Sequence, residues 1–166
     1  MSAVFSPCRR YRYRLDRDLG NLTATRGAVA FVGLNASVAD EEKNDPTIRR
    51  EIGFARAWGF AKLIKGNAYG LASTDPRGLW RVADPVGPDN DGHIEAIARE
   101  AELVVCAWGG NCKPERSRAI VAAIRRAKRD LYMLGENDDG SPRHPLYLRA
   151  SLTPVPWSAP YPWATP

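Results

Sequence analysis

Short apolar runs alternate with segments of helical periodicity over most of this chain. Four runs are apolar and too short for helices of ordinary length, at residues 28–34, 61–65, 103–107 and 131–134. Between them, apolar residues recur every three or four positions, as they do on the buried side of a helix. Strands that alternate with helices form a mostly parallel sheet with helices on both faces. We therefore predict an α/β fold, with three α/β/α layers around a mostly parallel four-stranded sheet.

Capping residues mark the first helix. Asp45 and Pro46 suit the N-cap and the first position of a helix, which we predict over residues 46–58. Apolar residues at helical spacing predict two more helices, over residues 94–101 and 114–129. Each of these helices lies between two apolar runs, as crossover connections between parallel strands require.

The N-terminal part of the chain predicts a different kind of strand. Residues 8–15 alternate between apolar and basic side chains, which is the pattern of a half-buried strand. Tyr11, Tyr13 and Leu15 are expected on the buried face, with the arginines between them on the other. Because charged side chains protect an exposed sheet edge, we predict an antiparallel strand at the edge of the sheet.

The length of the chain fits one domain. Its 166 residues, 44% of them hydrophobic, can bury one core of ordinary size. We predict a single domain over residues 1–150 and a tail rich in Pro and Trp, residues 151–166, docked on its surface. No apolar run has the length of a membrane span or the pattern of a signal peptide, which favours a cytoplasmic location without a membrane partner. The oligomeric state stays open.

Basic residues are unevenly spread along the chain, whose net charge is +5. One cluster falls in the third predicted helix and includes Arg125, Arg126 and Arg129. Basic patches attract polyanions, so these three arginines are candidate contacts to the phosphates of DNA or of a nucleotide. The alternative is an ordinary solvated helix face.

A short polar motif follows each apolar run. The four motifs lie at residues 33–37, 66–69, 108–111 and 143–146. The carboxyl ends of parallel strands meet at one edge of a sheet, where open α/β sheets bind ligands. We therefore expect one pocket that offers amides and one imidazole and carries little charge.

Two asparagines are candidate site residues. Asn35 can orient a water or a ligand carbonyl but cannot remove a proton, so it would position a reactant rather than act as a base. Asn67 carries an amide of the kind that pairs with the edge of a nucleobase. Its neighbour Tyr69 could stack on that base or cover the core. For both asparagines the alternative is a hydrogen bond to their own turn.

The last two motifs add an imidazole and a glycine loop. His144 could donate a hydrogen bond to negative charge that develops on a ligand oxygen, although a surface turn histidine is an equal alternative. Trp108 would form a wall of the pocket. The free amides near Gly109, in the motif that ends at Asn111, would suit a phosphate.

Candidate general bases near these motifs are few, and so are motifs for cofactors. Asp40, Glu41, Glu42 and Asp45 are the nearest candidate general bases, and capping already explains Asp45. No carboxylate pair, metal-ligand cluster, Walker loop, dinucleotide fingerprint or Ser-His-Asp order is visible. This argues against glycosidases, metalloenzymes, kinases and dehydrogenases. We predict neither a bound metal nor a cofactor.

Several longer motifs add a family resemblance. They lie at residues 31–37, 45–50, 53–59, 74–76, 83–91 and 143–148. Together they resemble a bacterial and phage family known as domain of unknown function 1643. The resemblance covers residues 8–148 and implies no established activity.

The strand-end motifs, in the same order, also resemble those of the uracil-DNA glycosylase superfamily. The matching positions are Gly33 with Asn35, then Asn67, then Trp108 with Gly109, and finally His144 with Pro145. In that superfamily the first motif positions the attacking water and the second reads the base. The resemblance also implies that superfamily's three-layer fold.

The second resemblance implies an enzyme that draws a base of DNA into its pocket and excises or processes it. Asn35 would hold water, Asn67 would read the base and His144 would stabilise negative charge on it. The most active members carry aspartate where this chain has Asn35, so slow hydrolysis or processing of a modified base is expected. Two alternatives stay open: a noncatalytic module that binds nucleic acid or nucleotides, and an enzyme on free nucleotides.

Overall fold

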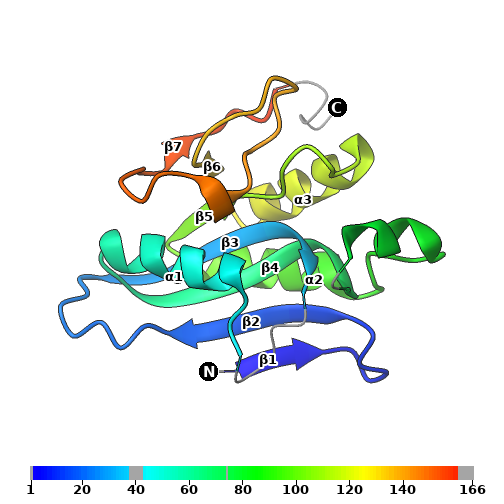
Figure 1. The fold of residues 1–166 in the computed structure, drawn as a ribbon, viewed down its shortest axis with the longest axis horizontal. Helices are drawn as coiled ribbons and strands as arrows, with labels where there is room; N and C mark the ends of the chain where they lie inside the picture. The colour runs from blue at the N-terminus through cyan, green and yellow to red at the C-terminus, as the bar shows by residue number, and fades with distance from the viewer. Residues whose placement is uncertain (1, 38–42, 74, 161–166) are drawn as a thin grey trace.

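One mixed sheet runs through the centre of the molecule (Figure 1). The computed structural model describes residues 2–37, 43–73 and 75–160. The sheet has seven strands in the order β1-β2-β4-β3-β5-β6-β7. The strands are β1 (Ser2–Phe5), β2 (Arg12–Asp18), β3 (Arg26–Ala36), β4 (Phe60–Ala72), β5 (Leu103–Cys106), β6 (Tyr132–Met133) and β7 (Val155–Pro156).

Helices cover both faces of this sheet. They are α1 (Pro46–Ala57), α2 (Asn90–Glu100) and α3 (Pro114–Arg126), with the short 3-10 turns η1 (Pro76–Arg81) and η2 (Pro145–Tyr147). Buried residues of α1 pack into one hydrophobic cluster, and those of α2 and α3 pack into the other. Strands β4, β3, β5 and β6 are parallel, which confirms the α/β class. The antiparallel N-terminal strand is present as β2, and the sheet is larger than expected because β1 and β7 add two further antiparallel strands.

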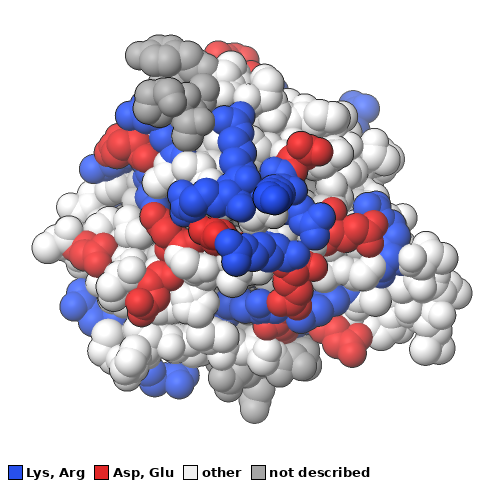
Figure 2. Space-filling view, turned by 180° about the vertical axis from the view of Figure 1, so that it is seen from behind, with Lys and Arg blue, Asp and Glu red and all other residues white. Residues whose placement is uncertain are grey.

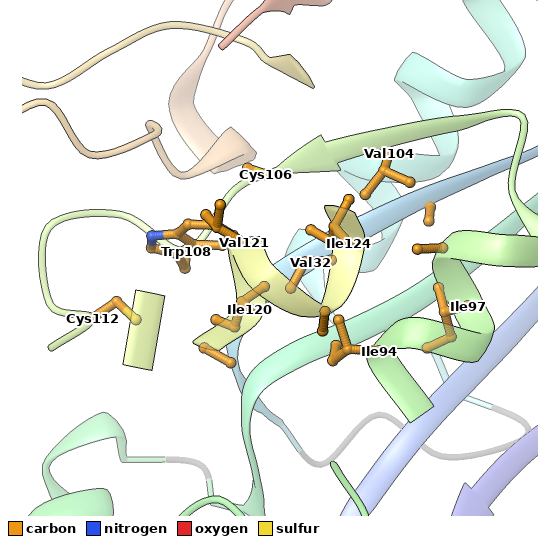
Figure 3. Packing of buried hydrophobic residues seen from close by; sticks show 14 of the residues in the cluster. Val32, Ile94, Ile97, Val104, Cys106, Trp108, Cys112, Ile120, Val121 and Ile124 are labelled. Carbon is orange, nitrogen blue, oxygen red and sulfur yellow. The ribbon is translucent and has the colours of Figure 1, made fainter. Parts of the chain in front are cut away.

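Figure 3 shows the larger cluster, where α2 and α3 pack against the central strands. Ile120 and Ile124 of α3 are completely buried, as are Ile94 and Ile97 of α2. Trp108 lies beyond the end of β5 at the margin of this cluster. Both faces of the parallel strands are covered, which explains why most of their central residues are apolar and do not alternate with polar ones.

The two central strands are longer than the apolar runs that predicted them. We expected strands to end near residues 34 and 65, but β3 continues to Ala36 and β4 to Ala72. The pairing of Asn35 with Tyr69 extends the parallel ladder beyond the apolar runs. On the other side of β4, main-chain bonds to Pro85 and Val86 support this extension. The polar motifs that contain Asn35 and Asn67 therefore lie within strands and not in loops.

The N-terminal strand β2 differs from the expected edge strand. It lies between β1 and β4, so β1 is the edge. Tyr11 and Tyr13 pack into one cluster, but Leu15 packs into the other. The register of the β1–β2 pair shifts between Val4 and Phe5, and a bulge of this kind reverses the faces of the side chains that follow it. Arg12 lies on the face opposite Tyr11 and Tyr13, as expected, but it is buried rather than solvated and contacts the main chain at Ser37.

The C-terminal segment adds to both the sheet and the core. Strand β7 pairs with β6, and the main-chain N–H of Trp157 donates to the carbonyl of Leu131. The ring of Trp157 is buried and meets that of Trp108 edge-on, with 5.5 Å between the ring centroids. Residues 161–166 of the predicted tail lie outside the described residues.

Helix α1 begins where its capping residues predicted. Asp45 is the N-cap, its carboxylate oxygen Oδ1 accepts from the main-chain N–H of Ile48 at 2.7 Å, and Pro46 occupies the first turn. Asp89 is the N-cap of α2, but its side chain makes no capping bond. These two aspartates therefore form a matched pair for measuring what the cap contributes.

We expect Asp45→Ala to lower the free energy of unfolding by about 1 kcal/mol, because it leaves an amide of the first turn without an acceptor. Asp89→Ala should change it by less than about 0.5 kcal/mol. Urea denaturation of both variants measures the difference. Equal losses would contradict the capping role of Asp45.

Two of the three cysteines lie in the core. Burial raises the pKa of the Cys112 thiol to about 12 and also raises that of Cys106, so neither forms a reactive thiolate near neutral pH. Cys8 is exposed and also free. Over the described ranges, no helix is long and apolar enough to cross a membrane.

Candidate functional site

A cavity of about 200 Å³ opens at the carboxyl ends of β3 and β4. Its walls come from both strands, from the start of α1, from β2 and from the turn before η2. The lining residues are Arg12, Gly33, Leu34, Asn35, Ser37, Asp45, Thr47, Ile48, Lys65, Asn67, Ser73 and His144. Four residues that the sequence proposed for one pocket, Gly33, Asn35, Asn67 and His144, are therefore together in this cavity.

The two asparagines are held by main-chain groups. The side-chain amide nitrogen of Asn35 donates to the carbonyls of Ser73 at 2.9 Å and Ala36 at 3.2 Å. The side-chain nitrogen of Asn67 donates to the carbonyls of Asn35 at 3.1 Å and Gly66 at 3.2 Å. Each amide oxygen is therefore the atom left to accept from a ligand or a water. Asn67 is buried and its neighbour in the cavity, Asn35, is half-buried.

His144 stands at the mouth of the cavity and keeps a fixed tautomer. The main-chain N–H of Leu146 donates to Nδ1 of His144 at 3.3 Å, so the proton of the neutral ring lies on Nε2. The residue is exposed on one side, but desolvation by the cavity walls lowers the pKa of its imidazole to about 4, and the positive charge of Lys65 adds to this effect. Neutral His144 is thus a hydrogen-bond donor at physiological pH.

The imidazole resonances of His144 should titrate with a pKa of about 4 in an NMR experiment. Its folded pKa is below the unfolded value of about 6.5, so the folded state binds fewer protons between these values. His144 therefore makes a contribution to stability that is lost as the pH falls from about 6.5 toward 4. An inflection near pH 6.5 would contradict the placement of the ring against the cavity wall.

A charged pair that the sequence did not indicate lies at the floor of the cavity, with Lys65 in the lining and Glu51 behind it. Lys65 of β4 and Glu51 of α1 are both buried, and Lys65 Nζ lies 2.5 Å from Glu51 Oε1. Burial raises the pKa of Glu51 above its ordinary value, and the charge of Lys65 opposes this effect. Arg12 is buried as well and donates from Nη1 to the carbonyl of Ser37 at 3.2 Å. The expectation of a pocket with little charge is therefore wrong.

Asp45 is the carboxylate that lines the cavity. Its Oδ1 caps α1, and its Oδ2 accepts from the hydroxyl of Ser37. Each carboxylate oxygen has a second lone pair, so Asp45 can still accept from a water in the cavity. The other acids proposed as bases, Asp40, Glu41 and Glu42, lie outside the described residues.

A shallow groove of about 430 Å³ adjoins the cavity. The cavity and the groove share Leu34, Asn35 and His144. The groove adds the glycine loop after β5 and one basic side chain, and its other lining residues are Trp108, Gly109, Gly110, Asn111, Asn137, Arg143 and Leu148. Trp108 is almost completely buried, so it supports the groove from below instead of standing up as a wall.

Tyr69 lines neither the cavity nor the groove among the pockets described. Its hydroxyl accepts from the main-chain N–H of Lys113 at 3.2 Å, and its ring meets that of Trp80 edge-on. Burial raises the pKa of Tyr69 to about 12. Of the two roles open from the sequence, stacking on a base or covering the core, this position fits the second.

Comparison with known proteins gives one match. A family model described as "Protein of unknown function (DUF1643)" matches residues 12–146. The chain belongs to this family. No curated protein and no solved structure matches. All four cavity residues proposed from the sequence therefore lie within the part of this DUF1643 member that the family model covers, and so does the pair of Lys65 and Glu51.

The three arginines proposed to bind nucleic acid lie elsewhere on this DUF1643 protein. Helix α3 runs back from the carboxyl end of β5, so its last turn is at the opposite edge of the sheet from the cavity. Arg126 pairs with Glu95, Arg129 donates to the carbonyls of Ala98 and Arg99, and Arg125 donates to that of Ser158. Figure 2 shows basic side chains interleaved with acidic ones on the face turned away in Figure 1.

Over residues 2–37, 43–73 and 75–160, no group of three or more His, Cys, Asp or Glu side chains is placed to hold a metal ion. The cavity is lined by two amides, an imidazole and the charged side chains of Lys65, Arg12 and Asp45.

Proposed function

We propose that this protein binds a nucleobase in the cavity and hydrolyses the N-glycosidic bond that joins the base to its sugar. The observation that carries the proposal is the meeting of Asn35, Asn67 and His144 around one cavity, although they are far apart in the sequence. A volume of about 200 Å³ is below the range of about 300–1,000 Å³ that holds a whole drug-sized ligand. It suits a single flat heterocycle.

The neighbouring groove would hold the rest of the substrate. It continues from the cavity at Asn35 and His144, so a sugar attached to the bound base would lie along it. Arg143 would face the phosphate, which guanidinium groups favour, with the loop of Gly109 and Gly110 beside it. The main-chain N–H of Gly109 already donates to the carbonyl of Pro142, so the free amide expected there is not present. This arrangement fits a base rotated out of a DNA strand.

Each polar group of the cavity has a separate role in the proposed hydrolysis. The bond between C1′ and the base nitrogen breaks, and its electron pair passes to the base. A water held by the amide oxygen of Asn35 and by Asp45 forms the new bond to C1′, and one of its protons passes to the base through solvent. His144, neutral and protonated on Nε2, donates a hydrogen bond to the negative charge on the base. Asn67 accepts from the edge of the base.

The experiment that tests this function measures base release. The protein is incubated with single-stranded and double-stranded oligonucleotides that each carry one uracil, hypoxanthine or oxidised base, and with the matching free nucleotides. Mass spectrometry then identifies any released base. We expect release from at least one of these substrates, and a loss of about 10²-fold in kcat/KM for Asn67→Ala, which removes the base contact.

Asn21→Ala is the matched control, since Asn21 lies in the turn before β3 and away from the cavity. It should keep the activity of the unmodified protein. The absence of base release from every substrate would contradict the proposed function. Equal activity of Asn67→Ala and Asn21→Ala would remove Asn67 from base recognition.

A second candidate is a module that binds a base without turnover. The observation in its favour is that both oxygens of Asp45 already accept hydrogen bonds, so the cavity has no uncommitted carboxylate as a base among the residues that line it. Binding of an oligonucleotide or a free nucleotide without base release would support this candidate. Thermal-shift measurements with nucleotides and with oligonucleotides separate a free-nucleotide ligand from a polymer.

A further inference from the structure

Lys65 brings a positive charge to the floor of the cavity. It lines the cavity from β4 and is only 4% exposed. Its ammonium group has three N–H donors. Within the described part of the chain it makes one side-chain hydrogen bond, to Glu51. A buried lysine with one acceptor has donors left for a ligand.

Gly33 of the neighbouring strand makes room for the Lys65 ammonium at the cavity wall. Gly33 of β3 lies beside Asn67 in the ladder and also lines the cavity. A Cβ atom built on Gly33 would lie only 2.5 Å from Lys65 Nζ and 3.1 Å from the side-chain amide of Asn67. The ammonium of Lys65 therefore packs against the main chain of Gly33, in the place that a side chain would fill. Lys65 and Asn67 both line the cavity beside Gly33.

The positive and negative groups around this part of the cavity are equal in number but differ in position. Lys65 and Arg12 face Asp45 and Glu51, while His144 at the mouth is neutral. Glu51 lies beneath Lys65 and outside the lining, and its second oxygen, Oε2, is buried without a partner in the described part of the chain. The ammonium of Lys65 therefore stands between Glu51 and the cavity. A ligand meets the cation and not the acid behind it.

We infer that Lys65 binds a ring carbonyl oxygen of the base, on which negative charge collects when the glycosidic bond breaks. This inference rests on the proposed function and names its substrate class, bases with a carbonyl group on the buried edge. Hydrogen bonds between an ammonium and an anionic oxygen are about twice as strong as neutral ones, so Lys65 favours the departing base over the bound substrate. A base that carries an amino group in place of this carbonyl would bring its N–H donors against the N–H donors of Lys65.

Binding of free bases tests the role of Lys65 without turnover. The probes are uracil, cytosine and barbituric acid, a planar pyrimidine that is anionic near neutral pH, and isothermal titration calorimetry gives their Kd values. We expect the intact protein to bind barbiturate about tenfold more tightly than uracil. The double variant K65M/E51M lacks both charged side chains and should bind barbiturate and uracil with Kd values within about twofold of each other.

Lys62→Met is the control, because Lys62 is on the same strand but pairs with Glu100 and Asp16 away from the cavity. It should keep the preference for barbiturate. Circular dichroism of K65M/E51M establishes that it folds. If the intact protein does not prefer barbiturate to uracil, or if K65M/E51M keeps the same preference, the role of Lys65 is overturned. Base recognition by the cavity is not affected by either result. An intact protein that binds none of the three bases would overturn the proposed function, and this inference with it.

Discussion

Glu51→Met should lower the free energy of unfolding by about 3–5 kcal/mol, the largest stability loss that the structure leads us to expect. Lys65 and Glu51 are 4% and 0% exposed, so removing the acid leaves a buried ammonium without its counter-charge. The cost of a buried unpaired charge exceeds what the pair itself contributes. Chemical denaturation in urea measures the change, provided that the slope with denaturant stays the same.

The double variant K65M/E51M separates this cost from ordinary packing effects. Replacing both partners by apolar residues leaves no unpaired charge, so its stability should lie within about 2 kcal/mol of the intact protein. Glu100→Met is the surface control, because Glu100 pairs with Lys62 and Arg14 in partial solvent and should change stability by less than about 1 kcal/mol. If Glu51→Met and K65M/E51M lost equal stability, the buried pair would not be the cause.

His144→Ala should lower kcat by about 10²–10³-fold on whichever substrate the base-release assay identifies. His144 is the donor at the mouth of the cavity, and its tautomer is set by the bond from Leu146. Because the negative charge on the base appears only as the bond breaks, KM should change much less than kcat. Initial rates measured over a range of substrate concentrations give both quantities.

The second histidine provides the control for this prediction. His93 stacks on Tyr13, with 4.8 Å between the ring centroids, and lies on α2 away from the cavity. His93→Ala should therefore keep kcat within about twofold of the intact protein. A full loss of activity in His93→Ala, or an unchanged kcat in His144→Ala, would contradict the role of His144.

The convergence of the site could be predicted because it follows from topology. Apolar runs and helical periodicity indicated parallel strands, and parallel strands bring their carboxyl ends to one edge. This argument needs no side-chain detail, so it placed Gly33, Asn35, Asn67 and His144 together correctly. It could not place Tyr69, because topology does not determine whether that ring enters the cavity or packs, as it does, with the hydrophobic cluster of α2 and α3.

The charged floor of the cavity could not be predicted in the same way. Arg12 and Lys65 occur in strands where basic residues normally face solvent, and Glu51 occurs on a helix with many exposed charges. These side chains are buried because the chain at Ser37 contacts Arg12 and because α1 packs across β4, and no local pattern of the sequence indicates either contact. The one available signal was Lys65 itself, which ends the run at residues 61–65 directly before the polar motif at residues 66–69.

The account depends most on the claim that a base occupies this cavity. NMR spectroscopy of the labelled protein, titrated with the oligonucleotide that binds most tightly, tests this claim directly. We predict concerted shifts of the side-chain amides of Asn35 and Asn67 and of the His144 ring, with the Nε resonances of Arg125, Arg126 and Arg129 unchanged at physiological salt. Shifts confined to those arginines, with the cavity signals unmoved, would contradict it.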